Sequence, residues 1–569
     1  MMKDTKNSEN AAVRDNFISE IYDLGVSVRK ESVLSELPVR LADMHRSGAV
    51  HIHDLESGGR VYNCCTPAWG KLLSAHDYGS VSSSGAVFEI FAVCKQVITE
   101  LAVSQTGGIG FVNFDIDVGA ELERLHVAFG TSVETVVGDA IRDFLVWINR
   151  TRTRYNREPY YLSLNVGLGT GVWARTITRL LMEKSMCLPA DHIRPNIIFK
   201  VKKGVSWGEG SPNADLLDLA LKCTADRMRP TYLLLDSKCN ADCDPTMLGI
   251  MGCRTRVYQN INGKVGTIGR GNISCVSINL PRIALMHNDE KSFFLHLEST
   301  MCSCAEILKV RIRNLLASDK IEDVIRKGYW ENTDTQLDMV RQGSCSIGFI
   351  GLAEAVEVLT GKKMYTDGAR DLAYRIIMNM RMTVDRLRAT ESLNYTLLAS
   401  PGEMISGRFA EIDAKLYPHR VQEKGFYTNS FHSEVDAGMG VCAKLRFEGR
   451  FHELCNGGSI SYVELLEAPL MNVLGLHDIL EVASRCGVSY LGINYPLDVC
   501  RGCNHKGTFD VCPVCGSEDI KRIRRVSGYL EDVDHFTKGK AREVQIRTAN
   551  ACCGRSTLNS NGEKNAYLN

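Results

Sequence analysis

Two C-x-x-C pairs lie close together near the end of this 569-residue chain, in the stretch CRGCNHKGTFDVCPVC. The pairs are Cys500/Cys503 and Cys512/Cys515. Each pair can close a tight knuckle, and two knuckles supply four thiolates for a tetrahedral Zn²⁺ ion. Four sulfur ligands leave no position open for water, so such a metal would be structural and would fold a segment with little core of its own. Two redox motifs are the alternative, but those normally precede a helix of a thioredoxin-like unit.

A glycine in the stretch RRVSGYL (524–530) follows these cysteines. Gly528 is either an ordinary turn glycine, among the 49 of this chain, or the site of a stable radical. A glycyl radical needs a Cα hydrogen without a side chain, between an amide and a carbonyl group that delocalise the unpaired electron. It also needs a loop that an activating enzyme can reach and that then packs inside the protein. A C-terminal loop beside a metal-folded module meets both needs.

The elements that must position these groups alternate between helix and strand. Helical spacing of apolar residues predicts helices over 10–47, 84–103, 116–157 and 171–186, and short β-rich runs predict buried strands over 195–201 and 230–236. The stretch AVHIHDLES indicates a short strand with His51 and His53 on one face, and 344–361 indicates a strand, a glycine turn and a helix. Because no linker divides some 400 residues of this alternation, we predict one large α/β domain, a barrel.

The composition is that of a soluble globular protein, with 44% apolar and 24% charged residues. Lys+Arg and Asp+Glu are both 67, and this balance argues against a generic nucleic-acid or membrane-surface binder. No run of eighteen apolar residues occurs and the N-terminus is polar, so we expect a cytoplasmic protein. Its 21 cysteines are then mostly free thiols, which makes their positions informative.

The order of ribbon, RVSGY and short tail resembles that of the anaerobic (class III) ribonucleotide reductases, a family of glycyl radical enzymes. Other stretches also resemble blocks of this family in the family's order: HIHDLE followed by NCC (63–65), SQTGGIGFVNFD (104–115), MGCRT (251–255), GRGNISCVSINLPR (269–282), SIGFIGLAEA (346–355) and YTNSFH (427–432). The resemblance implies a ten-stranded α/β barrel with a central finger loop. It implies anaerobic reduction of ribonucleoside triphosphates to deoxyribonucleoside triphosphates.

The same resemblance implies roles for individual residues. Gly528 corresponds to the glycyl radical, and Cys253 of MGCRT to the finger-loop cysteine, whose thiyl radical breaks the ribose 3′ C–H bond. Cys64 corresponds to the thiol on the opposite strand that protonates the departing 2′-hydroxyl. The adjacent Cys65 would point to the other face of the strand and ranks lower.

Cys275 departs from the pattern of the many family members that use formate as reductant. It stands where redoxin-using relatives place the partner of the first-strand thiol. The resemblance therefore implies a Cys64–Cys275 disulfide in each turnover, reduced by thioredoxin or a glutaredoxin-like protein, with formate as the second choice. The tail pair Cys552–Cys553 is either an electron relay or an ordinary part of the tail.

Partners and domain limits follow from the resemblance. It implies a separate radical S-adenosylmethionine activating enzyme with a 4Fe-4S cluster, deoxynucleotide effectors and a homodimer, with no membrane and no nucleic acid. We predict a helical segment over 1–48, the catalytic barrel over 49–495, the zinc ribbon over 496–518, and the glycyl radical loop and tail over 519–569. Because the catalytic blocks begin near residue 49, we expect no N-terminal ATP-binding domain.

Two other readings remain open at this stage. One is a different glycyl radical enzyme, of the pyruvate formate-lyase type, in which RVSGY also occurs. Those enzymes place paired cysteines at the mid-barrel loop, whereas the mid-chain cysteine is single here. The other is a zinc-ribbon nucleic-acid-binding protein, suggested by KRIRR at 521–525. This hypothesis leaves most of the chain unexplained, and the ribbon segment lacks the interleaved aromatic residues of a nucleic-acid-binding surface.

Overall fold

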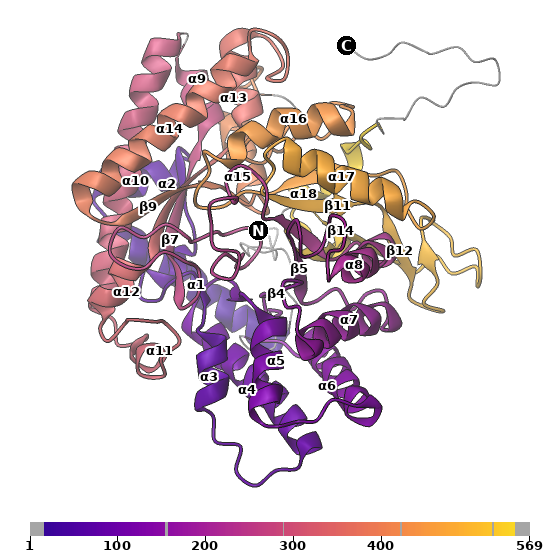
Figure 1. Ribbon diagram of the computed structural model, residues 1–569. Coiled ribbons are helices and arrows are strands. Elements are labelled where there is room, and N and C mark those ends of the chain that lie inside the picture. Colours follow the sequence, from indigo (N-terminus) through magenta and orange to yellow (C-terminus); the bar gives the residue numbers. More distant parts are fainter. Residues whose placement is uncertain (1–15, 154–157, 288, 422–423, 526–527, 552–569) are drawn as a thin grey trace, which may run out of the picture.

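One large sheet runs through the computed structural model, which describes residues 16–153, 158–287, 289–421, 424–525 and 528–551 (Figure 1). Ten strands form one continuous path, and an eleventh, β1 (Val50–Ile52), pairs with β7. The order along the path is β10 (Ser461–Glu464), β11 (Tyr490–Asn494), β6 (Thr231–Leu234), β5 (Asn196–Val201), β4 (Leu162–Val166), β3 (Ile109–Phe111), β2 (Cys64–Thr66), β7 (Arg270–Asn279), β8 (Ser344–Ile350) and β9 (Asn394–Ala399).

The path consists of two parallel halves. Strands β2 to β6 are mutually parallel, as are β7, β8 and β9, and β10 and β11 are parallel to each other. The halves meet in antiparallel pairs, β2 with β7 and β6 with β11. A parallel bridge joins Leu398 of β9 to Gly458, three residues before β10, and so brings the two ends of the path together. This confirms the predicted α/β class and ten-stranded path.

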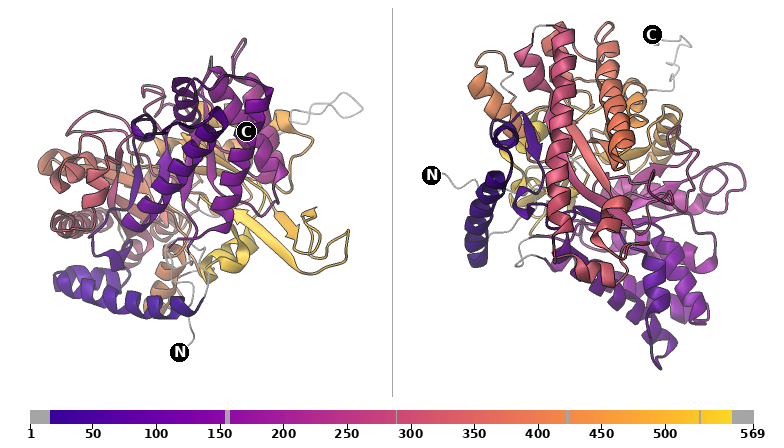
Figure 2. Two further views of the ribbon diagram at one scale, coloured as in Figure 1. Left: turned by 90° about the horizontal axis from the view of Figure 1, so that it is seen from below. Right: turned by 90° about the vertical axis from the view of Figure 1, so that its left-hand side faces the viewer.

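Helices surround the large sheet in Figures 1 and 2. Those before β7 are α1 (Phe17–Glu36), α2 (Val39–Arg46), α3 (Trp69–Ala75), α4 (Ser83–Ser104), α5 (Phe114–Arg124), α6 (Thr131–Arg150), α7 (Val172–Cys187) and α8 (Ala214–Arg227). Those after it are α9 (Leu280–Met286), α10 (Glu290–Leu316), α11 (Glu322–Arg326), α12 (Gln336–Gln342), α13 (Leu352–Thr360), α14 (Arg370–Glu391), α15 (Ile405–Leu416), α16 (Val441–His452), α17 (Val473–Arg485) and α18 (Lys538–Ile546). Among the described residues, no helix is both long and apolar enough to cross a membrane.

The two faces of the strands differ in character. On β7, Val276 and Ile278 belong to the main apolar core that the helices cover. The opposite face carries polar groups, which bond to one another across the strands. The Ser277 hydroxyl shares a hydrogen bond with that of Ser400, and the Ser346 hydroxyl of β8 shares one with that of Thr396 of β9. This alternation along a strand directs apolar side chains outward to the helices and polar side chains into the barrel.

The segment between β6 and β7 enters the barrel as a finger loop. A bridge between Met251 and Thr255 closes its tip around Cys253. Asn165 of β4 holds the ascending arm, since its amide nitrogen donates to the Ile250 carbonyl and its amide oxygen accepts from the Ile250 N–H, both at 3.0 Å. Ser163 of β4 donates to the Gly252 carbonyl at 2.7 Å. These hydrogen bonds supply partners for backbone groups of the finger loop that are buried inside the barrel.

A second sheet forms the C-terminal module, with the order β13 (Lys506–Gly507), β12 (Leu497–Cys500), β14 (Ile520–Arg525) and β15 (Leu530–Asp532). It lies at one side of the barrel (Figure 1). Its four strands run across the predicted limit between ribbon and radical loop at residue 518. A small apolar cluster that includes Met228 and Leu530 joins the module to the barrel, and a buried ion pair links Arg194 to Glu531.

Most predicted elements lie where the sequence placed them. The expected helix over 10–47 contains α1 and α2, and the two predicted strands are β5 and β6. The expected helix over 116–157 is divided into α5 and α6. His126, with a φ of 52°, and Gly130 lie in the connection, and a left-handed residue ends a helix.

Candidate active site and metal centre

Gly528 lies directly against the tip of the finger loop. A Cβ placed on Gly528 would be 2.3 Å from the Cβ of Cys253 and 2.9 Å from its Cα. The φ of Gly528 is +149°, which side chains rarely adopt. No residue with a side chain can therefore occupy position 528 while this contact is kept. The structure thus brings together the two residues that the sequence singled out 275 positions apart.

The tyrosine that follows the glycine fills the space beside the fingertip. Tyr529 packs against the ring of Tyr161, with 5.1 Å between ring centroids, and its hydroxyl oxygen is buried. Its hydroxyl would lie 2.9 Å from a Cβ on Gly108 and 3.8 Å from a Cβ on Gly252. Small residues at 108 and 252 thus leave room for the radical loop to approach the finger.

Cys64 of β2 also faces the fingertip. Its sulfur accepts a hydrogen bond from the Gly108 N–H at 3.1 Å and donates one to the Asn63 side chain at 2.9 Å. A Cβ on Gly252 would lie 3.6 Å from this sulfur. Burial, with a further contribution from Cys253, raises the pKa of the Cys64 thiol well above its usual value. Cys65 points to the opposite face, where it joins the apolar core.

Both thiols at the centre of the barrel are held in the protonated form. Burial raises the pKa of Cys253 to about 11, so its sulfur keeps its hydrogen at neutral pH. A thiol is a hydrogen-atom donor, whereas a thiolate is a nucleophile and metal ligand. The site is therefore suited to hydrogen-atom transfer rather than to nucleophilic attack.

A β-bulge decides the position of Cys275. Asn272 of β7 pairs with Cys64 on β2 and with Ser344 on β8. The register between β7 and β8 shifts just after Asn272, and Cys275 therefore pairs with Ser346. Asn272 donates to the hydroxyls of both serines, at 3.0 and 2.7 Å, so these side chains share the inner face. Cys275 thus lies on the same inner face as Cys64, on the neighbouring strand.

Sequence reasoning missed the hydroxyl groups that line the barrel. Ser277 shares hydrogen bonds with Ser400 at 2.6 Å and with the His53 ring at 2.8 Å. The His51 and His53 rings meet edge to face, with 4.9 Å between ring centroids. In the sequence, these serines are marked only by their alternation with apolar residues along β7 and β8. This alternation predicts that each strand has a polar and an apolar face, but it does not tell which face lines the barrel interior.

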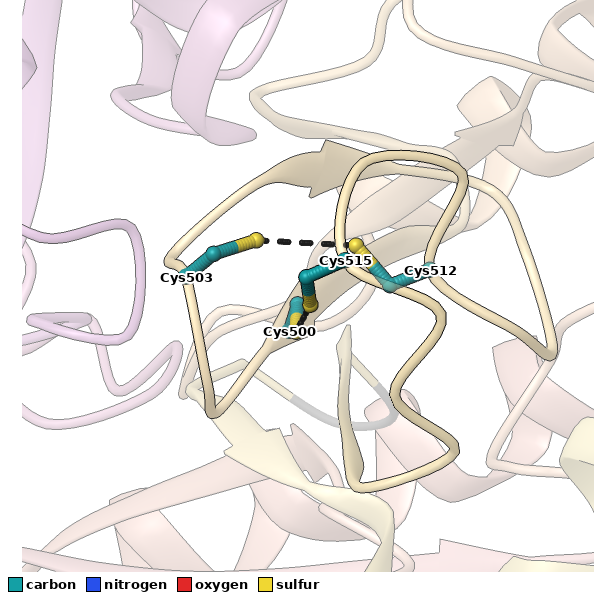
Figure 3. Close-up of side chains that lie close together, drawn as sticks. All are labelled: Cys500, Cys503, Cys512 and Cys515. Atoms are coloured by element: carbon teal, nitrogen blue, oxygen red, sulfur yellow. Dashed lines mark hydrogen bonds between the residues drawn. The ribbon is translucent and has the colours of Figure 1, made fainter.

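The four cysteines near the C-terminus converge as predicted (Figure 3). The sulfurs of Cys500 and Cys515 are 3.4 Å apart, those of Cys503 and Cys512 are 3.6 Å apart, and all four lie within 4.8 Å of one another. Four thiolates around Zn²⁺ at about 2.3 Å would be about 3.8 Å apart. This donor set fits zinc.

The fold and site together define a barrel oxidoreductase with buried thiols around a finger loop and a glycine docked from a C-terminal module. The family model described as "Anaerobic ribonucleoside-triphosphate reductase" matches residues 9–549. The chain belongs to this family, as predicted, and these findings support neither the pyruvate formate-lyase-like enzyme nor the nucleic-acid-binding protein.

Similar proteins agree with this assignment. The chain is 28% identical to the anaerobic ribonucleoside-triphosphate reductase of Haemophilus influenzae, over 95% of this chain and 83% of that protein. It is 26% identical to the enzyme of Enterobacteria phage T4, over 91% of this chain and 93% of that protein. The structure of the Thermotoga maritima anaerobic ribonucleotide reductase in complex with dATP and CTP has a TM-score of 0.69 at 15% identity, covering 92% of this chain and 89% of that chain.

Proposed function

We propose that Gly528 carries the stable radical and passes it to Cys253, which attacks the ribose of a bound ribonucleoside triphosphate. The observation that carries this proposal is the contact between Gly528 and Cys253, where a Cβ would lie 2.3 Å from the cysteine Cβ. A hydrogen atom moves from the Cys253 sulfur to the Gly528 Cα, so one S–H bond breaks and one C–H bond forms. The thiyl radical then takes the 3′ hydrogen atom of the ribose.

Cys64 supplies the next step from the other side of the fingertip. Because burial keeps it protonated, it can donate a proton to the 2′-hydroxyl, which leaves as water. Two thiols, Cys64 and Cys275, then provide two electrons and become a disulfide. Cys253 returns the hydrogen atom to C3′ and recovers its radical from the S–H bond. The sum is one ribonucleotide and one dithiol giving one deoxyribonucleotide, one disulfide and one water.

We propose thioredoxin or a glutaredoxin-like protein as the reductant, with formate as the second choice. Cys64 and Cys275 lie on the same inner face of two paired strands, β2 and β7, and this supports the redoxin proposal. Thiol exchange with a redoxin would restore the dithiol after each turnover. The predicted relay pair Cys552–Cys553 lies outside the described residues.

The four cysteines of the C-terminal module would hold Zn²⁺. Bound zinc supplies a fixed tetrahedral crosslink there and no chemistry at the substrate. Cys500 belongs to β12, which pairs along its whole length with β14, and β14 ends at Arg525. The zinc site would thereby fix the strand from which the Gly528 loop departs.

A separate activating enzyme that uses S-adenosylmethionine and a 4Fe-4S cluster would generate the radical. Since Gly528 is packed against Cys253, the loop must leave the barrel before such an enzyme can reach the Cα hydrogen. Deoxynucleotide effectors, a homodimer and a cytoplasmic location complete the proposal. The Thermotoga maritima relative in complex with dATP and CTP supports a nucleotide effector and substrate for this chain.

The deciding experiment is anaerobic formation of dCTP from CTP by protein activated with its activating enzyme. Thioredoxin, thioredoxin reductase and NADPH serve as the reductant, without formate. We expect product with the wild type and with Cys345→Ala, whose sulfur lies in the outer apolar core, but none with Cys275→Ala. Product only after formate is added would overturn the redoxin proposal. No product with either reductant, while the glycyl radical signal is present, would overturn the reductase proposal.

A further inference from the structure

Arg547 lies where the two ends of the segment that carries Gly528 come together. Its guanidinium donates to the carbonyl of Arg525, the last residue of β14, at 2.9 Å. Arg547 itself directly follows α18. The two bonded residues are 22 positions apart, and Gly528 lies between them in the chain. One side chain thus closes this segment at its base.

The same guanidinium ties the base of the segment to the barrel. It donates to Glu464 of β10 at 3.3 Å and to Glu543 of α18 at 3.0 Å. Glu464 is fixed in turn, because its other carboxylate oxygen accepts from Asn494 of β11 at 2.9 Å. Arginine presents a planar, rigid fork of donors, whereas lysine presents a single flexible ammonium. Arg547 therefore joins β14, α18 and the barrel wall through one rigid group.

The charges of this cluster are buried. The side chains of Arg547, Glu464 and Glu543 are 12%, 11% and 2% exposed. Burial lowers the pKa of Arg547, but the charges of the two carboxylates outweigh it and the pKa is raised, so the guanidinium stays charged. Lys540 pairs with Glu543 at 2.6 Å and also donates to Asn429 at 2.8 Å. Removing one partner of a buried pair leaves an uncompensated charge, so these groups resist separation.

A chain of contacts leads from this cluster to the radical position. The Arg525 guanidinium is directed at the Gly528 carbonyl at 3.5 Å and donates to the carbonyl of Met228 at the end of α8. Arg525 is 1% exposed, and a close-packed side chain has little freedom to move by itself. Holding the Arg525 backbone in place therefore also holds Gly528 against the fingertip.

We propose that Arg547 is a positioning residue that keeps Gly528 docked beside Cys253; this rests on the proposed function. In the docked state its hydrogen bonds are made and the radical can pass to Cys253. Undocking breaks the hydrogen bond from the Arg547 guanidinium to the Arg525 carbonyl and exposes Gly528 to the activating enzyme. Arg547 thereby sets the ratio between the undocked state, which is activated, and the docked state, which turns over.

The test compares Arg547→Gln, Arg547→Lys and Glu464→Gln with the wild type. Arg542→Gln is the matched control, because Arg542 is exposed on α18. The rate of Cys253 alkylation by a maleimide is measured in the protein before activation, with Cys345 of the outer apolar core as the internal control. The initial rate of glycyl radical formation with the activating enzyme is measured by electron paramagnetic resonance.

Both rates report the undocked population, so we expect both to rise at least tenfold in Arg547→Gln, by factors that agree within threefold. A tenfold change corresponds to about 1.4 kcal/mol. Arg547→Lys keeps the charge but not the fork, and Glu464→Gln removes the charge of the barrel partner, so both should give smaller increases. Arg542→Gln should match the wild type. The formation of dCTP per radical should not exceed that of the wild type in any variant.

The inference is overturned if Cys253 alkylation in Arg547→Gln stays within threefold of the wild type. It is also overturned if Cys345 alkylation accelerates to the same extent, since Arg547 would then serve general stability. Faster alkylation without faster radical formation, while the wild type does form the radical, overturns it as well. If alkylation of Cys253 rises as expected but no protein forms a radical, the docking role is supported and the proposed function fails.

Discussion

Replacing Gly528 with alanine should expel the radical loop from the barrel. The new Cβ would lie 2.3 Å from the Cβ of Cys253, whereas carbon atoms in contact are about 3.5–4.0 Å apart. The loop or the fingertip must therefore move by more than about 1 Å. Overpacking of this kind costs about 1–3 kcal/mol, and an unfavourable φ adds about 1–3 kcal/mol. A total of about 2–6 kcal/mol shifts the ratio of docked to undocked loop by roughly 30-fold to 10⁴-fold.

The exposure of Cys253 reports this displacement directly. Alkylation of Cys253 by a maleimide, followed by mass spectrometry, should be at least tenfold faster in Gly528→Ala than in the wild type. Gly438→Ala is the matched control, because Gly438 has a φ of +62° and open space around its Cβ position. It shares the backbone strain without the clash, so its alkylation rate should equal that of the wild type. No glycyl radical signal should form in Gly528→Ala.

Protection of Cys253 in Gly528→Ala would refute this reasoning. If the thiol is alkylated as slowly as in the wild type, the loop has stayed docked and the close contact does not govern its position. If Gly438→Ala accelerates alkylation equally, backbone strain or general loosening explains the effect.

Other parts of the site can be tested in the same way. Cys500→Ser removes one of the four ligands, so metal analysis should show zinc falling from about one per chain to near zero, and retained zinc would contradict the predicted site. Glu531→Gln breaks the buried pair with Arg194, which should cost about 3–5 kcal/mol and speed hydrogen exchange in β14 and β15. Burial raises the pKa of Glu531, but Arg194 outweighs it and the pKa is lowered. The pair therefore stabilises fully above about pH 4.3 and the stabilisation is lost as the pH falls further, so the protection of β14 and β15 amides, relative to their intrinsic exchange rates, should fall below that pH in the wild type and not in the variant. Cys64→Ala should form no dCTP while keeping the radical, whereas Cys65→Ala should keep turnover within threefold; equal losses would contradict the assignment of the two faces.

The sequence by itself determined the class of protein and most of the chemistry-bearing residues. The spacing of Cys500, Cys503, Cys512 and Cys515 specifies a metal site because two knuckles close locally, without help from distant chain. RVSGY and the ordered blocks around Cys64 and Cys253 specified the family. Alternation of helices and strands specified the α/β class, since each pattern depends on local periodicity.

Only the tertiary structure decided how these residues meet. Gly528 reaches Cys253 because the C-terminal module docks on the barrel through contacts such as Arg194–Glu531, which join residues 337 positions apart. The face of Cys275 depends on one β-bulge, because a shift of one residue moves every following side chain to the other face, and no local pattern marks it.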